Sequence, residues 1–184
     1  AYAAMARPGY EADREVIQLR NLATGEVRAL TGDWDRSVGS IAWAPDSRSL
    51  LVTAGDTLDT PLFRVDVRTG RPARLTQGGT VGNVTPLANG AAVYTLNNIE
   101  APDDLYRLDR RGRATRLTSV NADRLADLDP VNVRRFSYPG ANGDTVWGQI
   151  IKPANASGRL PVALLIHGGP QGSFGNSWSY RWNP

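Results

Sequence analysis

The sequence contains no cysteine among its 184 residues, and it has a single histidine and a single methionine. The absence of cysteine excludes structural disulfides, zinc sites built from thiolates and thiol nucleophiles. No run of apolar residues approaches the roughly 20 that a membrane-spanning helix needs. The first residues, Ala1–Ala6, also lack the basic start and the apolar stretch of a signal peptide. These absences exclude several classes of protein but leave the compartment open.

Lysine is also scarce, because Lys152 is the only one and the net charge of +3 is carried by arginine. A concentrated basic surface would indicate nucleic acid, but acidic residues alternate with the arginines along this chain. The densest group lies beside three aspartates and comprises Arg107, Arg110, Arg111, Arg113 and Arg116. We therefore predict a solvated edge here and no nucleic-acid partner.

A weak repeat runs through residues 1–118. The dipeptide Leu-Thr recurs at positions 30–31, 75–76 and 117–118, at spacings of 45 and 42 residues. A tight turn that contains glycine precedes each dipeptide, at Gly25, Gly70 and Gly112. The regular spacing indicates that one structural unit is repeated.

Each unit contains short segments with the alternating pattern of β-strands. Strands are predicted at 62–67 and 104–108, and earlier hairpins at 40–53 and 81–96. Four short strands in 42 to 45 residues match the length of one β-propeller blade. An antiparallel sandwich with coincidental spacing is the alternative, and the constant phase of the Leu-Thr dipeptide favours the propeller. Two whole blades and the end of a third are visible, so we expect further blades before residue 1.

The pattern changes after residue 118. Residues 119–130 form a polar linker with room for one helical turn, and 131–138 and 145–152 are predicted to pair as a hairpin. The apolar run Val162–Ile166 then indicates a strand that is buried on both faces. The run ends at His167-Gly168-Gly169-Pro170, where two glycines free the backbone and the proline stiffens the start of the next loop.

The turn at 167–170 is the main candidate for a functional site. In α/β-hydrolases, a junction between a buried strand and a loop supplies a backbone N–H to the oxyanion hole. We predict that the N–H of Gly169 has this role and that Gly168 and His167 shape the turn. A tight turn without a catalytic role is the alternative, and the preceding strand and blades favour the catalytic interpretation.

His167 could also be considered as a general base, because it is the only histidine. In α/β-hydrolases, however, the catalytic histidine follows the nucleophile and the acidic residue in the chain, whereas His167 precedes the candidate serines. We therefore predict that His167 shapes the turn through its ring nitrogens and does not move a proton. A purely structural histidine at the end of a strand is the remaining alternative.

The serine motif G-x-S-x-G of these enzymes is absent. One near miss, Gly175-Asn176-Ser177-Trp178-Ser179, lacks the closing glycine, and another, Gln171–Gly175, lacks the opening one. Both directly follow the predicted strand, before any second strand that could present a nucleophile. We therefore expect the nucleophile and the rest of a catalytic triad beyond Pro184.

Aromatic residues mark two further segments. Trp178, Tyr180 and Trp182 are candidate substrate-binding residues because such loops can line pockets, and ordinary packing is the alternative. Trp34 lies between two aspartates, and an inter-blade turn is preferred there over a metal or ligand site. No metal site and no cofactor are predicted.

Taken together, these motifs resemble the prolyl oligopeptidase family of serine peptidases, and most of all its dipeptidyl-peptidase and acylaminoacyl-peptidase branch. The most specific match runs from His167 to Pro184. Weaker matches are Trp43-Ala44-Pro45-Asp46-Ser47, which is similar to the family's Trp-Ser-Pro-Asp-Gly blade turn, and Leu117–Asn121. The resemblance covers essentially the whole chain, loosely before about residue 130 and strongly after it.

The resemblance implies a propeller that caps an α/β-hydrolase domain and admits short peptides to a buried Ser-His-Asp site. It implies that Gly169 donates one oxyanion N–H and that the residue after the nucleophilic serine donates the other. The expected fold class is therefore β-propeller blades in 1–118, a linker in 119–130 and the first strands of an α/β-hydrolase domain in 131–184, incomplete on both sides. The segment alone is predicted to be inactive, and the exported members of the family favour the periplasm.

Two other functions stay open. Esterase- or lipase-type α/β-hydrolases usually show His-Gly-Gly-Gly and carry no propeller, so Pro170 and the repeat argue against them. A non-catalytic propeller that binds partners would explain 1–118 but gives no role to 145–184. The predicted partners are short peptides, and the sequence predicts no oligomeric state.

Overall fold

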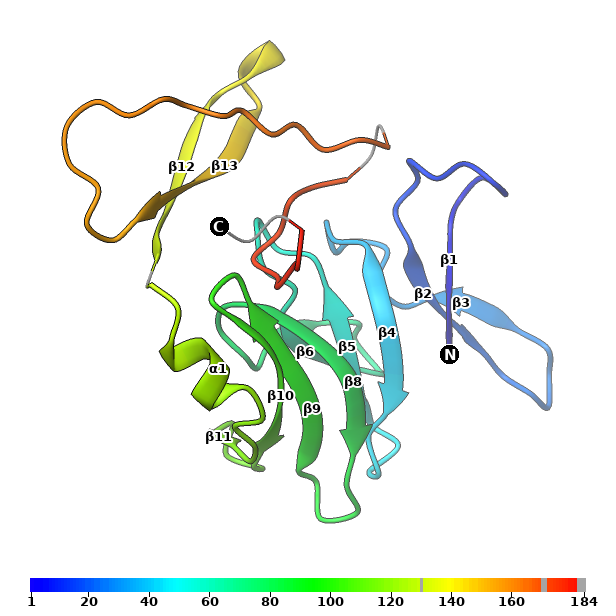
Figure 1. The fold of residues 1–184 in the computed structure, drawn as a ribbon. Helices are drawn as coiled ribbons and strands as arrows, with labels where there is room; N and C mark the ends of the chain where they lie inside the picture. The colour runs from blue at the N-terminus through cyan, green and yellow to red at the C-terminus, as the bar shows by residue number, and fades with distance from the viewer. Residues whose placement is uncertain (130, 170–171, 182–184) are drawn as a thin grey trace.

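Three antiparallel sheets follow one another along the first 116 residues of the computed structural model, which describes residues 1–129, 131–169 and 172–181 (Figure 1). The N-terminal sheet has the order β1-β2-β3, with β1 at Tyr2–Ala4, β2 at Val16–Arg20 and β3 at Val27–Ala29. The middle sheet has the order β4-β5-β6-β7, with β4 at Val38–Trp43, β5 at Ser49–Ala54, β6 at Leu62–Asp66 and β7 at Pro72–Arg74. The third sheet has the order β11-β10-β9-β8, with β8 at Thr80–Pro86, β9 at Ala92–Asn98, β10 at Ala101–Leu108 and β11 at Ala114–Arg116. Within the described residues the sheets stay open and do not close into a ring.

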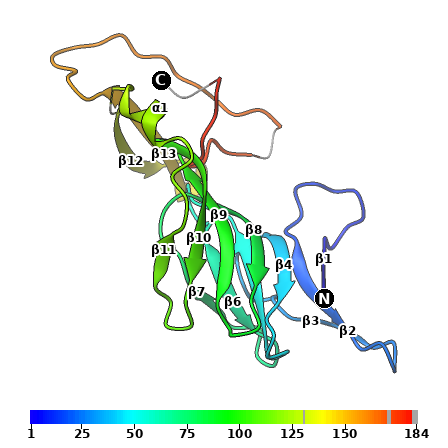
Figure 2. The ribbon, with the colours of Figure 1, turned by 60° about the horizontal axis from the view of Figure 1, so that its bottom comes forward.

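A hairpin stands apart from the three sheets. The short helix α1 (Ala122–Ala126) leads to it, and β12 (Val131–Pro139) pairs antiparallel with β13 (Thr145–Pro153) across a 3-10 turn at Ala141–Gly143. Figure 2 shows this hairpin at one end of the sheets. Residues 154–169 and 172–181 form no helix or strand.

Most of the predicted elements are confirmed. The strands predicted at 62–67 and 104–108 correspond to β6 and β10, and the hairpins predicted at 40–53 and 81–96 correspond to β4–β5 and β8–β9. The hairpin after the linker is confirmed as β12–β13, and the single helical turn in the linker is α1.

The buried strand predicted at Val162–Ile166 is wrong for the described chain. This segment has no regular structure, and it is exposed, with Val162 at 91% and Ile166 at 77%. A strand is stable only when its backbone N–H and C=O groups are paired with a neighbour. In the described residues no strand is hydrogen-bonded to the segment. The apolar run is therefore present without the strand that it predicted.

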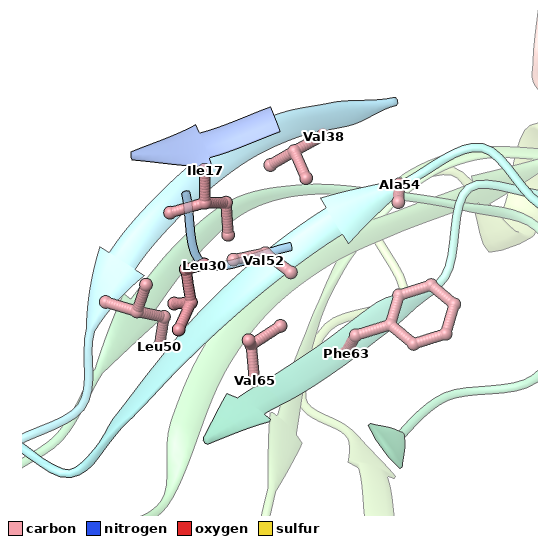
Figure 3. Packing of buried hydrophobic residues seen from close by; sticks show 8 residues of the cluster. All are labelled: Ile17, Leu30, Val38, Leu50, Val52, Ala54, Phe63 and Val65. Atoms are coloured by element: carbon pink, nitrogen blue, oxygen red, sulfur yellow. The ribbon is translucent and has the colours of Figure 1, made fainter. Parts of the chain in front are cut away.

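The core is built around β5, whose six residues are all buried. Since successive side chains of a strand point to opposite faces, Leu50 and Val52 pack toward the N-terminal sheet while Leu51 packs toward the third sheet. The first of these clusters consists of Ile17, Leu30, Val38, Leu50, Val52, Ala54, Phe63 and Val65 (Figure 3). The second consists of Leu51, Leu62, Val81, Ala92, Tyr94 and Leu108. The middle sheet is therefore packed between its two neighbours.

The repeated Leu-Thr dipeptide has the same structural role in each sheet. Thr31 Oγ1 accepts a hydrogen bond from the N–H of Ile17 at 2.9 Å, and Thr76 Oγ1 accepts one from Leu62 at 2.9 Å. Thr118 Oγ1 accepts from Leu105 at the same distance. The threonine thus satisfies a backbone donor of the second-outermost strand, just past the point where the outermost strand ends. This shared role explains why the dipeptide recurs at one phase of the repeat.

The glycine turns that precede the dipeptides also share one construction. Gly25, Gly70 and Gly112 have φ angles of 76°, 73° and 80°, which favour glycine. Gly70 also lies against the neighbouring sheet, since a Cβ placed on it would be 1.9 Å from the carbonyl oxygen of Leu30. The turn at Gly70 is therefore fixed by packing as well as by backbone conformation.

Candidate functional site

The glycine turn is held in a conformation that favours glycine. Gly169 has a φ of 135°, in a region that side chains with a Cβ rarely adopt. His167 Nδ1 donates a hydrogen bond of 3.2 Å to the carbonyl oxygen of Gly168. The ring therefore contacts the backbone of the turn. Pro170, the last residue of the predicted motif, lies outside the described residues.

The backbone folds back on this turn at Gly172. A Cβ placed on Gly172 would lie 3.1 Å from the carbonyl oxygen of Gly168 and 3.5 Å from His167 Nδ1. Gly172 therefore packs against the turn, and a side chain there would have to displace it. His167, Gly168 and Gly172 form one local unit.

The chain after Gly172 lies between the hairpin and the ends of the middle and third sheets (Figure 1). Asn176 fixes it there through four hydrogen bonds. Its backbone N–H donates to the carbonyl oxygen of Leu58 at 2.5 Å, and its backbone oxygen accepts from Thr80 Oγ1 at 3.1 Å. Its side-chain oxygen accepts from the N–H of Ile99 at 3.1 Å, and its Nδ2 donates to Asp59 Oδ1 at 2.9 Å.

The hairpin holds the same segment from the other side. Gln149 on β13 donates from Nε2 to the carbonyl oxygens of Phe174 at 3.1 Å and Gly175 at 3.2 Å. One residue beyond Ser177, the N–H of Trp178 donates to Asn97 Oδ1 at 3.0 Å. We call residues 172–178 the docked segment, because both neighbouring structures bind it.

Asp59 is the charged centre of this region. Its side chain is only 4% exposed, and its Oδ1 accepts hydrogen bonds from Arg135 at 2.5 Å, Asn176 at 2.9 Å and the N–H of Gly79 at 2.9 Å. Arg74 lies 3.7 Å from the other carboxylate oxygen. Burial opposes ionisation of Asp59, but the hydrogen bonds from Arg135 and Asn176 outweigh it and hold the pKa of this carboxyl below its ordinary value. The carboxylate is therefore charged and joins three segments of the chain.

Two of the three predicted substrate-binding residues lie together at the end of the docked segment. Trp178 and Tyr180 make an edge-to-face contact with ring centroids 6.5 Å apart. Trp178 is half-buried and Tyr180 is 91% exposed. Trp182 lies outside the described residues. In the described part of the chain no hydrogen bond or ring contact joins this pair to His167, Gly168 or Gly169.

The other residues singled out in the sequence have packing or ion-pair contacts within the fold. Trp34 packs edge-on against Phe63 with ring centroids 4.9 Å apart, and its N–H closes a turn onto Thr31. In residues 1–129, 131–169 and 172–181, no group of three or more histidine, cysteine or acidic residues is placed to hold a metal ion. Arg116 and Arg113, from the densest arginine group, pair with Asp104 and Asp109. No helix of the described chain is long and apolar enough to cross a membrane.

Sequence reasoning missed Asp59, Arg135, Gln149 and the role of Asn176. Asn176 was considered only as part of an incomplete serine motif, although a polar residue inside an aromatic loop was a usable signal. The other three carry no local signal, because their role depends on contacts between distant segments.

Comparison with known proteins finds that the chain is similar to peptidases. The chain is 33% identical, over an alignment of 193 residues that covers all of it, to dipeptidyl-peptidase 5 of Trichophyton schoenleinii. It is also 33% identical over 198 residues to a probable dipeptidyl-peptidase 5 of Aspergillus clavatus. The chain spans 26% of the length of each of these relatives. No family model matches it.

The fold is also similar to that of a solved peptidase structure. An acylaminoacyl peptidase from Pyrococcus horikoshii superposes with a TM-score of 0.76 at 23% identity, over 92% of this chain and 26% of that one. The two chains therefore share a fold over most of the length of this one. The chain is thus similar in sequence to dipeptidyl-peptidases 5 and in fold to an acylaminoacyl peptidase and a prolyl endopeptidase.

Proposed function

We propose that this chain is part of a serine peptidase that hydrolyses short peptides by acyl transfer through a Ser-His-Asp triad. In this proposal residues 1–118 are blades of a β-propeller, 119–130 are the linker and 131–184 begin the α/β-hydrolase domain. The nucleophile, the aspartate and the catalytic histidine lie beyond residue 184. The observation that carries the proposal is the similarity of the whole chain to dipeptidyl-peptidases 5.

The role proposed for Gly169 is to donate its N–H to the oxyanion of the tetrahedral intermediate. Its φ of 135° supports this role, because residues held in a sparsely populated backbone conformation cluster at active sites. The N–H is also accessible, since Gly169 is exposed. An oxyanion donor of this kind typically contributes about 2.7–4 kcal/mol of transition-state stabilisation.

The exposed run Val162–Ile166 supports the position proposed for the hydrolase domain. Contiguous exposed apolar residues mark a surface that another part of a protein covers. In the proposal, later residues of the hydrolase domain cover this run.

A labelling experiment tests the proposal. A fluorophosphonate, which reacts with activated serines, is added to the protein encoded by the complete reading frame and separately to residues 1–184. We expect stoichiometric labelling of the former and none of the latter. Labelling of residues 1–184, or no labelling and no peptide hydrolysis by the complete protein, would contradict the proposal.

A further inference from the structure

Asn176 is unusual in the docked segment because all of its hydrogen-bonding groups contact the sheets. Both backbone groups and both side-chain atoms are bonded, to Leu58, Thr80, Ile99 and Asp59. These partners come from the β5–β6 connection, the start of β8 and the β9–β10 turn. A residue with this pattern fixes both the position and the direction of the chain at one point.

Close backbone packing surrounds this point. A Cβ placed on Gly175 would lie 3.2 Å from the carbonyl oxygen of Leu58, so the segment approaches the sheet as closely as a glycine allows. On the opposite side Gln149 binds the carbonyl oxygens of Phe174 and Gly175. The segment therefore has little freedom to shift toward the sheets or away from them.

A direct contact connects the docked segment to the glycine turn. Gly172, its first residue, packs against the carbonyl oxygen of Gly168 and the ring of His167. Displacement of the docked segment would therefore move the atoms that hold the turn. The catalytic effect of such a movement is large, because a misplacement of about 1 Å can lower a rate by about a hundredfold.

We infer that Asn176 is a positioning residue: by binding Asp59 and the neighbouring sheet residues, it sets the location of the turn that carries the Gly169 N–H. The inference rests on the proposed function, since it assigns Asn176 an effect on the oxyanion donor. The sheets thereby contribute to the geometry of the reaction site as well as covering it. Asn176 itself touches no reacting atom.

The hydrogen bond between Asn176 and Asp59 offers a charge-swap test. Asn176→Asp places a second carboxylate at the distance of a hydrogen bond from the buried Asp59, and the two charges repel. Asp59→Asn combined with Asn176→Asp removes this repulsion and keeps the net charge of the wild type, although Arg135 and the N–H of Gly79 lose the carboxylate of Asp59 as their acceptor. Asn155→Asp, at an exposed position outside the docked segment, is the matched control.

The variants are made in the complete protein and assayed on a peptide substrate. We expect Asn176→Asp to lower kcat about tenfold to a hundredfold with little change in KM. We expect the double variant to recover part of this loss, because the repulsion is gone while the Asp59 contacts to Arg135 and Gly79 are also lost, and Asn155→Asp to be unchanged. If Asn176→Asp leaves kcat unchanged, or lowers it without recovery in the double variant, the inference is wrong.

Hydrogen exchange provides a readout that does not depend on activity. The amides of Asn176 and Trp178 are bonded to Leu58 and Asn97, so they should exchange faster in Asn176→Asp and slowly again in the double variant. These exchange effects in a protein that neither reacts with a fluorophosphonate nor cleaves peptides would refute the proposed function but not the anchoring. Unchanged exchange at both amides in Asn176→Asp would refute the anchoring. If that variant does not fold, the double variant decides, because without the repulsion it should fold and keep slow exchange at both amides, and fast exchange there would refute the anchoring.

Discussion

Asp59 and Arg135 form an ion pair of 2.5 Å between Oδ1 and the guanidinium, although 76 positions separate them in the sequence. Asp59 lies in the connection between β5 and β6, and Arg135 lies on β12. The pair therefore joins the hairpin to the middle sheet. Because Asn176 binds the same oxygen, the pair and the docked segment are parts of one arrangement.

The lowered pKa of Asp59 makes the stability of this arrangement depend on pH. A carboxyl whose folded pKa is lowered stabilises the fold above the ordinary pKa of aspartate, about 3.9, and loses this contribution as the pH falls through the folded value. We expect Asp59→Asn to lower the free energy of unfolding by about 1–2 kcal/mol at pH 7, since Arg135 is partly exposed. The difference from the wild type should shrink as the pH falls below about 4. Urea unfolding at pH 7 and pH 3 measures it, with the exposed Asp123→Asn as control.

Gly70 should not tolerate a side chain. Alanine there would meet the carbonyl oxygen of Leu30 at 1.9 Å and would also adopt a φ of 73°. At Gly112 the φ is similar, at 80°, but nothing lies within 4 Å of the added Cβ. We expect Gly112→Ala to cost about 1–2 kcal/mol and Gly70→Ala about 1–3 kcal/mol more, measured as free energies of unfolding. Equal effects of the two substitutions would show that the contact with Leu30 is unimportant.

The repeated threonine should contribute to stability through its hydroxyl. Thr76→Val keeps the shape of the side chain but leaves the buried N–H of Leu62 without its acceptor. We expect a loss of about 1–3 kcal/mol in the free energy of unfolding. Thr115→Val, at an exposed position on β11, should change it by less than about 0.5 kcal/mol. Denaturant unfolding of both variants tests this, and a Thr76→Val protein as stable as the wild type would rule out the role assigned to the hydroxyl.

His167 should affect the turn without acting as the general base. In the complete protein, His167→Asn can still donate a hydrogen bond to the carbonyl oxygen of Gly168, whereas His167→Ala cannot. We expect the alanine variant to lower kcat/KM about tenfold and the asparagine variant to retain most of the activity. The pH dependence of kcat/KM should keep its shape in both, because it reports the catalytic acid and base. Loss of the acidic limb of that profile in both variants would make His167 the general base.

Gly169 should be the most sensitive position of the turn. Alanine at a φ of 135° is strained, so the peptide plane should rotate and carry the N–H away from the oxyanion. We expect Gly169→Ala in the complete protein to lower kcat about a hundredfold to a thousandfold with a small change in KM. Gly158→Ala, at an exposed glycine with a φ of 73°, controls for the loss of a glycine. An unchanged kcat would remove Gly169 from the proposed site.

Short-range patterns were sufficient to predict the sheets. Alternation of apolar residues, as in Phe63 and Val65, and the glycine turns are local signals, and the strands that they predicted are present. The run Val162–Ile166 misled because a strand also needs neighbours, and periodicity says nothing about whether they are available. Asp59, Arg135 and Asn176 could not be found this way, since the contacts that define them join residues 76 and 117 positions apart.

The position of these contacts along the chain has a consequence for folding. Leu58, Thr80 and Ile99 precede Asn176 in the chain, so their sheets emerge first during synthesis and can pack on their own clusters. The contacts of the docked segment join residues that are far apart in the sequence, so forming them costs loop-closure entropy. We therefore expect the segment to bind after the sheets have folded. The glycine turn should accordingly be ordered late, with the folded sheets acting as the template on which it takes its shape.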